Sequence, residues 1–159
     1  MRIRPATAED TPHIVKLGRQ LLELHTVFDF DYYQLEPDFD VQFAQWVHQQ
    51  LSTPYQFIFV SEEENGGQPV ISGFISGFMK ALYPWFKTKN VGHISYLIIN
   101  PAYRKKGVGK SLENMANAWF KEKNVRYVEL YVEEKNPIGK RAWESYGYMP
   151  FKKFLRKMI

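Results

Sequence analysis

Residues 103–111, YRKKGVGKS, place two glycines among basic side chains directly before a stretch of helical periodicity. Glycine lets a backbone approach a ligand closely, and the first turn of a helix offers unpaired N–H groups at the positive end of its dipole. Arg104, Lys105, Lys106 and Lys110 add positive charge. The stretch therefore predicts an anion site that suits a diphosphate, while a solvated basic turn that only starts a helix remains the alternative.

Gly109, Lys110 and Ser111 also match the last letters of the ATP-binding P-loop. That motif needs an earlier glycine, five positions before Gly109, so that the loop can curl around a β-phosphate. Arg104 stands at this position, and arginine cannot replace that glycine. Nucleotide hydrolysis is therefore not expected.

Metal and thiol chemistry find little support in the sequence. The chain has no cysteine, which excludes disulfides, thiolate metal sites and a cysteine nucleophile. The histidines, at positions 13, 25, 48 and 93, lack the spacing of metal ligands, and we interpret them as surface or packing residues. We expect no metal.

Charge is unevenly distributed along the chain. Residues 25–40, HTVFDFDYYQLEPDFD, contain five acids and no lysine or arginine. The net charge of the whole chain is +4, so the rest of the chain carries a net charge of +9. Carboxylates attract a cationic amine and aromatic rings cover its apolar part, so we expect this segment, with Asp29, Asp31 and Tyr32, to face an amine. The alternative is a solvated loop whose acids only balance a basic protein.

Hydrophobic periodicity predicts alternating blocks of helices and strands. We expect strands at 2–4, 55–61, 70–80, 93–99, 126–132 and 149–159, helices at 8–25, 41–51, 108–123 and 137–146, and a hairpin turn at 65–67. The order β-α-α-β-β-β-α-β-α-β favours a mixed α/β (α+β) sandwich, in which helices flank a central, mostly antiparallel sheet. Residues 1–159 are expected to form one domain.

Two segments carry a resemblance to a known family. LIINPAYRKKGVGKSLENMANAWF (97–120) resembles the acetyl-CoA-binding segment of the GNAT superfamily of N-acetyltransferases, and NPIGKRAWESYGYMPF (136–151) is similar to the family motif NxxAxxxYxxxGF. Both motifs stand at the family's spacing, and the expected element order fits the family's fold. The resemblance implies acetyl-CoA as cosubstrate.

The resemblance also implies positions for the cofactor. Leu97, Ile98 and Ile99 match the strand whose backbone pairs with the pantetheine arm. The pyrophosphate loop corresponds to Arg104, Lys105, Lys106, Gly107, Val108, Gly109 and Lys110. Asn136 matches an asparagine that hydrogen-bonds the cofactor arm, although it would equally serve as a helix N-cap. Lys105, Lys106 or Lys140 would meet the 3′-phosphate.

The family's usual catalytic side chains are missing. Trp143 stands where the family often has a proton-donating tyrosine, and Ser95 where it often has a basic glutamate. Tyr131 replaces a glutamate that N-terminal peptide acetyltransferases keep. Tyr146 is the remaining candidate for the acid, with packing as the alternative interpretation.

The resemblance thus implies an N-acetyltransferase that moves an acetyl group from acetyl-CoA to a primary amine by direct attack in a ternary complex. The acceptor would be a small molecule or a peptide. The alternative is a CoA-binding sensor or interaction module with little turnover. Nucleic acid and membrane partners are not expected, a homodimer is among the possible assemblies, and the start MRIRPATAED has no apolar signal core, which favours the cytoplasm.

Overall fold

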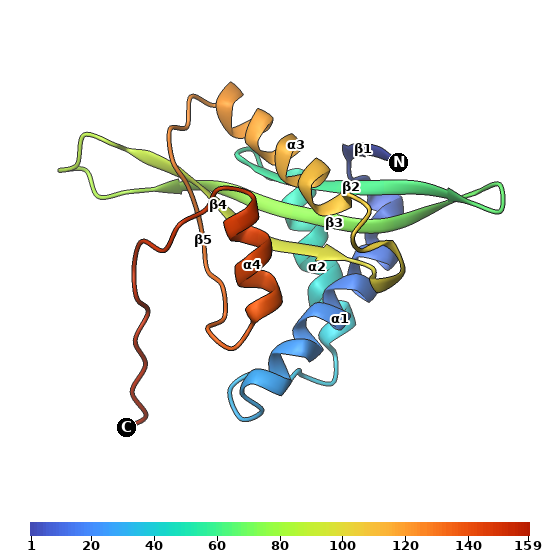
Figure 1. The fold of residues 1–159 in the computed structure, drawn as a ribbon, viewed down its shortest axis with the longest axis horizontal. Coiled ribbons are helices and arrows are strands. Elements are labelled where there is room, and N and C mark those ends of the chain that lie inside the picture. Colours follow the sequence, from blue (N-terminus) through green and yellow to red (C-terminus); the bar gives the residue numbers. More distant parts are fainter.

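The computed structural model describes residues 1–159 and is built around one twisted sheet (Figure 1). Its five strands lie side by side in chain order: β1 (Arg2–Pro5), β2 (Gln56–Asn65), β3 (Gln68–Ala81), β4 (Asn90–Ile99) and β5 (Val128–Leu130). The first three pairs are antiparallel and β4–β5 is parallel. The expectation of a mostly antiparallel sheet is therefore confirmed, as is the hairpin turn between β2 and β3.

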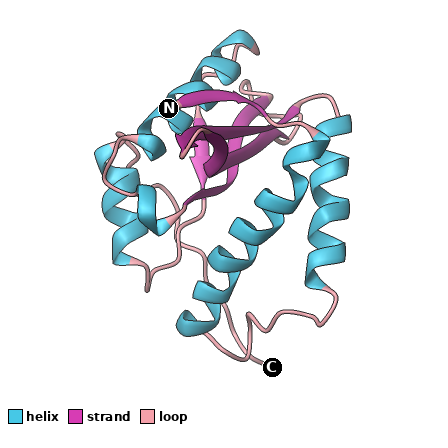
Figure 2. Ribbon diagram, turned by 90° about the vertical axis from the view of Figure 1, so that its right-hand side faces the viewer, coloured by secondary structure: helices cyan, strands magenta, loops and turns pink.

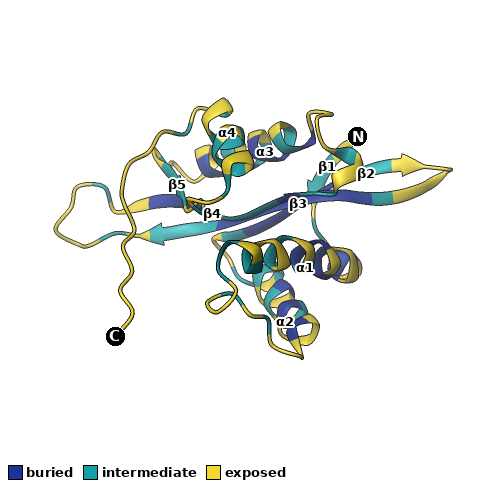
Figure 3. Ribbon diagram, turned by 60° about the horizontal axis from the view of Figure 1, so that its bottom comes forward, coloured by how far each residue is buried: buried dark blue, intermediate teal, exposed yellow.

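Helices cover both faces of the sheet (Figures 2 and 3). The helices α1 (Thr11–Phe28) and α2 (Phe39–Ser52) lie on one face, and α3 (Val108–Glu122) and α4 (Pro137–Ser145) lie on the other. Single turns of 3-10 helix at Ala8–Asp10 and Pro101–Tyr103 lead into α1 and toward α3. The expected sandwich of helices about a sheet is thus confirmed.

Two apolar cores follow from the alternation of side chains along each strand. Ile58 and Phe74 point toward α1 and α2, where they meet Phe43, whereas Phe57 and Ile75 point toward α3. Because both faces of the central strands are buried, these strands are apolar almost throughout.

A bulge in β4 changes which side chains face which helices. Gly77 of β3 pairs with Ile94, but the next residue, Ser76, pairs with Tyr96, so Ser95 has no partner on β3. Ile94 therefore packs in the core under α3, while Tyr96 packs against the core under α1 and α2. The bulge lies near the middle of β4.

The prediction of a final strand at 149–159 was wrong. Residues 149–159 form no strand, and all of them are exposed (Figure 3). From Phe151 onward the apolar residues recur at intervals of one and three rather than two, so an extended chain would not collect them on one face. The neighbouring edge is also short, because β5 has three residues where seven were expected.

No helix of this structure has the length and apolar character needed to cross a membrane.

Candidate cofactor and acceptor site

Strands β4 and β5 separate after a short parallel contact. Their pairing covers Gly92–Ile94 against Val128–Leu130 and then stops. Further along β4, the residues Leu97–Ile99 pair with β3 on one side and have no strand on the other. Unpaired backbone groups at an open strand edge can hydrogen-bond an extended ligand. This opening contains the three residues expected to pair with the pantetheine arm.

The glycine turn leads from β4 into the first turn of α3. Gly107 is the N-cap residue and has a φ of 81°, a left-handed conformation that favours glycine. Val108 is 1% exposed and anchors the turn in the core below α3. The first hydrogen bond of α3 runs from the N–H of Ser111 to the carbonyl of Gly107, so the N–H groups of 108–110 are free for a ligand.

Basic side chains surround this turn. The Nε of Arg104 donates to the carbonyl oxygen of Ile99 at 3.2 Å, and the ammonium group of Lys110 lies 2.9 Å from a carboxylate oxygen of Glu113. Lys105 and Lys106 are exposed and form no ion pair, although Lys106 lies over the ring of Tyr103. Free N–H groups and exposed cations at a helix N-terminus make an anion site.

Sequence reasoning missed a buried acid behind this turn. Glu113 is 1% exposed and accepts hydrogen bonds from Lys110 and from the side-chain amide of Asn117. Burial and the nearby Glu113 carboxylate raise the pKa of Tyr148. A carboxylate in the second turn of a helix with no unusual spacing gives no sequence signal of burial.

The structure places Tyr146, the candidate acid, against the glycine turn. A side-chain carbon added to Gly109 would lie 2.6 Å from the hydroxyl of Tyr146, so this glycine makes room for the ring's polar end. The ammonium group of Lys110 lies 5.1 Å from the ring centroid. Burial raises the pKa of the Tyr146 hydroxyl, which therefore stays protonated. Trp143 lies edge-on to Tyr146 and packs against the core under α3.

Asn136 caps α4. Its side-chain oxygen accepts a hydrogen bond from the N–H of Gly139 at 2.9 Å, which satisfies one of the free groups at the helix start. The amide nitrogen of the same side chain has no partner and remains able to donate. The cap and the expected contact with the cofactor are therefore compatible, because they use different atoms.

The acidic segment lies beside the connection between β5 and α4. The hydroxyl of Tyr33 donates to Glu133 at 2.9 Å, and the ammonium of Lys135 donates to the carbonyl of Phe28 at 2.8 Å. Burial and Glu133 raise the pKa of Tyr33 to about 12. These contacts join residues about a hundred positions apart in the chain and bring the segment toward the end of the opening where α4 begins.

The three residues expected to meet an amine have different surroundings. Asp29 accepts a hydrogen bond from the guanidinium of Arg156 at 2.5 Å, and the same guanidinium lies 4.7 Å from the ring centroid of Tyr32. Arg156 and the N–H of Tyr32 lower the pKa of Asp29. Asp31 is exposed and has no ion pair. Asp29 and Tyr32 thus already contact a cation, whereas Asp31 does not.

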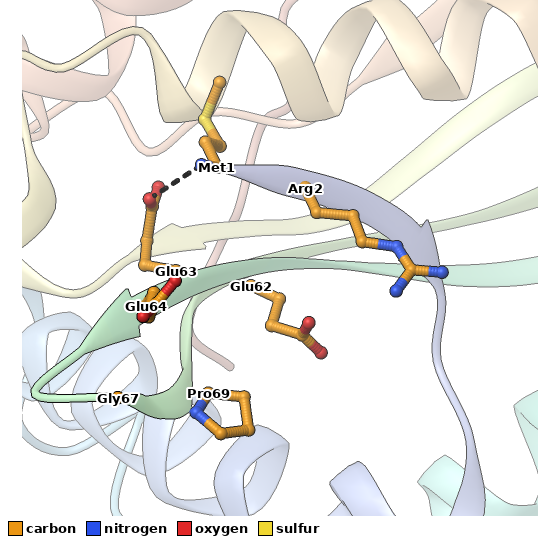
Figure 4. A pocket seen from close by; sticks show the side chains of 7 residues that line it. All are labelled: Met1, Arg2, Glu62, Glu63, Glu64, Gly67 and Pro69. Atoms are coloured by element: carbon orange, nitrogen blue, oxygen red, sulfur yellow. Dashed lines mark ion pairs between the residues drawn. The ribbon is translucent and has the colours of Figure 1, made fainter.

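The surface has two hollows, one away from this arrangement and one beside it. One of about 390 Å³ is formed by the start of β1 and the hairpin of β2 and β3, where the terminal ammonium of Met1 pairs with Glu63 at 3.2 Å (Figure 4). Another of about 270 Å³ is lined by the buried Glu113 and by Tyr146 and Tyr148, so it lies beside the glycine turn. No three histidine, aspartate or glutamate side chains meet in a geometry that could hold a metal ion.

The family follows from a comparison of the sequence with family models. The model of the acetyltransferase (GNAT) family matches residues 19–148. This match covers most of the chain, so the protein belongs to the GNAT acetyltransferase family, whose members use acetyl-CoA as the acetyl donor. No curated protein matches the sequence.

Solved structures share the whole fold at low sequence identity. A tetramutant of the BH1408 protein of Bacillus halodurans has a TM-score of 0.89 and 20% identity, with 100% of both chains covered. The aminoglycoside antibiotic 6'-N-acetyltransferase AAC(6')-IG of Acinetobacter haemolyticus has a TM-score of 0.75 and 20% identity, covering 100% of this chain and 99% of that one. A predicted acetyltransferase of Clostridium acetobutylicum, solved with acetyl-CoA, has a TM-score of 0.75 and 18% identity, covering 99% and 95%.

Proposed function

We propose that this protein transfers the acetyl group of acetyl-CoA to a primary amine of a small, positively charged molecule. The observation that carries the proposal is the strand opening of β4 and β5, which ends at a turn with free N–H groups. An extended thioester with a diphosphate at one end fits both features at once. The acidic segment supplies an acceptor surface near the other end of the opening.

The cofactor would be held mainly by the backbone. The N–H groups that follow Gly107 would bind the pyrophosphate, while Lys105 and Lys106 would reach outward toward the 3′-phosphate. The free edge at Leu97–Ile99 would pair with the pantetheine arm, and the unpaired amide of Asn136 would donate to it. The structure of a similar acetyltransferase with acetyl-CoA supports this cofactor.

The acceptor would bind on the side of α1 and α2. The contact of Asp29 and Tyr32 with the guanidinium of Arg156 supports a cation-binding role for this surface. Similarity to an aminoglycoside 6'-N-acetyltransferase supports a small amine over a protein terminus. An acceptor with two cationic groups would bind one of them on this surface and present the other, as the attacking amine, to the thioester.

Transfer would proceed by direct attack in a ternary complex. The neutral amine forms a bond to the thioester carbonyl carbon, the bond from that carbon to sulfur breaks, and coenzyme A leaves as a thiolate that takes up a proton. The chain has no cysteine to carry the acetyl group between substrates. Sequential rather than ping-pong kinetics are therefore expected.

Thiol release from acetyl-CoA with a panel of amines tests the proposal. Diamines and polyamines should give more thiol than neutral monoamines of the same length, and no thiol should appear above background without an amine. Intersecting double-reciprocal plots would support the ternary complex, whereas parallel plots would contradict it.

A CoA-binding module with little turnover is the second candidate, because Trp143 and Ser95 occupy the family's usual acid and base positions. It predicts tight CoA binding by calorimetry with no amine-dependent thiol release across the whole panel.

A further inference from the structure

Two buried polar atoms near the bulge of β4 have no hydrogen-bond partner. They are the Nδ1 atom of His93 and the hydroxyl oxygen of Ser76. Only two other side-chain atoms in the structure share this property, Thr11 Oγ1 and Gln56 Oε1. Unpaired buried polar atoms destabilise a fold, so two of them gathered on adjacent strands point to a function.

Strand register puts both atoms on the same face of the sheet. Phe78 pairs with His93 and Ser76 pairs with Tyr96, so Ser76 and His93 are diagonal neighbours across β3 and β4. Ile94 faces α3, so its neighbour His93 faces the side of α1 and α2, where the acceptor is proposed to bind. Tyr96 packs on this side as well.

His93 lies at the vertex of the strand opening. The paired stretch of β4 and β5 consists of Gly92, His93 and Ile94, and the strands diverge directly beyond it. In the proposed complex the thioester lies in that opening, with the amine approaching from the α1 and α2 side. His93 thus lies where the amine must lose a proton before attack.

We propose that His93 is the general base of acetyl transfer. This inference rests on the proposed function and assigns the base to a residue other than Ser95 and Tyr131. The acceptor ammonium gives one proton to the imidazole, and its freed lone pair forms the bond to the carbonyl carbon as the bond to sulfur breaks. The proton lost by the new amide nitrogen neutralises the thiolate, and the imidazolium releases its proton to solvent.

The surroundings of His93 keep the imidazole neutral and ready to accept. Its side chain is 8% exposed and lies between the rings of Phe78 and Tyr131. Lys80 of β3 and Glu129 of β5 form an ion pair of 2.5 Å beside it. Burial and the charge of Lys80 lower the pKa of His93, while Glu129 opposes the shift.

His93→Gln is the test, with His48→Gln on the exposed face of α2 as the matched control. His93→Gln should reduce kcat about 100-fold at pH 7 and leave the Kd for CoA unchanged, because only proton transfer is lost. The acidic inflection of the wild-type pH–rate profile, expected below pH 6.5 from the lowered pKa, should disappear in the variant. A kcat within about threefold of wild type, or a retained inflection, would overturn the proposal.

A measurement on the wild type keeps the proposal testable if His93→Gln does not fold. Nitrogen-15 NMR of the histidine rings should show His93 neutral at pH 7, and a charged ring would overturn the assignment. Because the folded pKa is lowered, neutral His93 contributes stability that is present above pH 6.5 and is lost as pH falls through the folded value. A wild type that releases no thiol with any amine contradicts the proposed function instead, while the NMR result still reports on His93.

Discussion

The two ends of the proposed site are built in different ways. At the cofactor end, the proposed binding groups are backbone N–H groups of consecutive residues after Gly107, held by the buried Val108. At the acceptor end, the proposed binding groups are side chains of the acidic segment, held by Glu133, Lys135 and Arg156 from the other end of the chain.

This difference determines how each end tolerates change. A backbone site depends on a local conformation, so a single side chain at the wrong position blocks it completely. A side-chain site with several exposed charges loses only the contribution of the group removed, which is small for exposed pairs in water. Sequence changes should therefore have large effects on the cofactor and graded effects on the acceptor.

Gly107→Val should have the largest effect on the cofactor end. A valine there would block the approach of the pyrophosphate, and losing several charge-assisted N–H contacts should weaken CoA binding by about 100-fold or more. Gly67→Val is the matched control, because Gly67 has a φ of 78° against 81° for Gly107 and both have open space around the α-carbon. Both variants should lose similar stability, and calorimetry should show weak CoA binding only for Gly107→Val. Equal CoA affinities in the two variants would show that the pyrophosphate binds elsewhere.

Asn136→Asp separates the helix cap from the cofactor contact. Aspartate keeps the oxygen that accepts from the N–H of Gly139 but loses the amide that would donate to the cofactor arm. The melting temperature should stay near that of wild type while the Kd for CoA rises about tenfold. Asn136→Ala is the comparison, and it should lower both the melting temperature and the affinity for CoA. Unchanged CoA affinity in Asn136→Asp would show that Asn136 caps the helix and does not bind the cofactor.

Asp29→Asn combined with Asp31→Asn should weaken the acceptor end alone. Removing the half-buried carboxylate of Asp29 and the exposed carboxylate of Asp31 should raise the acceptor KM about fivefold, because charges that remain in contact with water each contribute modestly. The KM for acetyl-CoA should not change. Glu64→Gln at the hairpin between β2 and β3 removes an exposed acid elsewhere and serves as the control. An equal rise in both KM values would show that the segment supports the whole opening rather than the acceptor.

Tyr146→Phe should have only a small effect on turnover. The hydroxyl of Tyr146 lies against Gly109 in the glycine turn, so its loss should lower kcat less than about tenfold and change mainly the KM for acetyl-CoA. A loss of about 100-fold in kcat would instead make Tyr146 the acid that protonates the thiolate. Trp143→Tyr tests the same question from the family's usual position, and a higher rate there would show that this position points at the sulfur.

Much of the fold could be predicted because its signals are local. The apolar periodicity of each segment predicted all four helices and the five strands of the sheet, because the buried face of each element repeats at that element's period. The final strand failed because a strand also needs a partner edge, and the short β5 does not supply it. Pairing between distant segments is not encoded in the periodicity of either one.

The sequence by itself determined the glycine turn, the helix that follows it and the cap at Asn136, because each depends on residues a few positions apart. Only the tertiary structure decided that His93 faces the side of α1 and α2, that Tyr146 lies over Gly109 and that Asp29 meets Arg156. The physical reason is the separation along the chain between the residues that interact. Backbone conformation and helix ends are set by neighbours in the chain, whereas strand register, a one-residue bulge and long-range ion pairs are set by packing of the whole molecule.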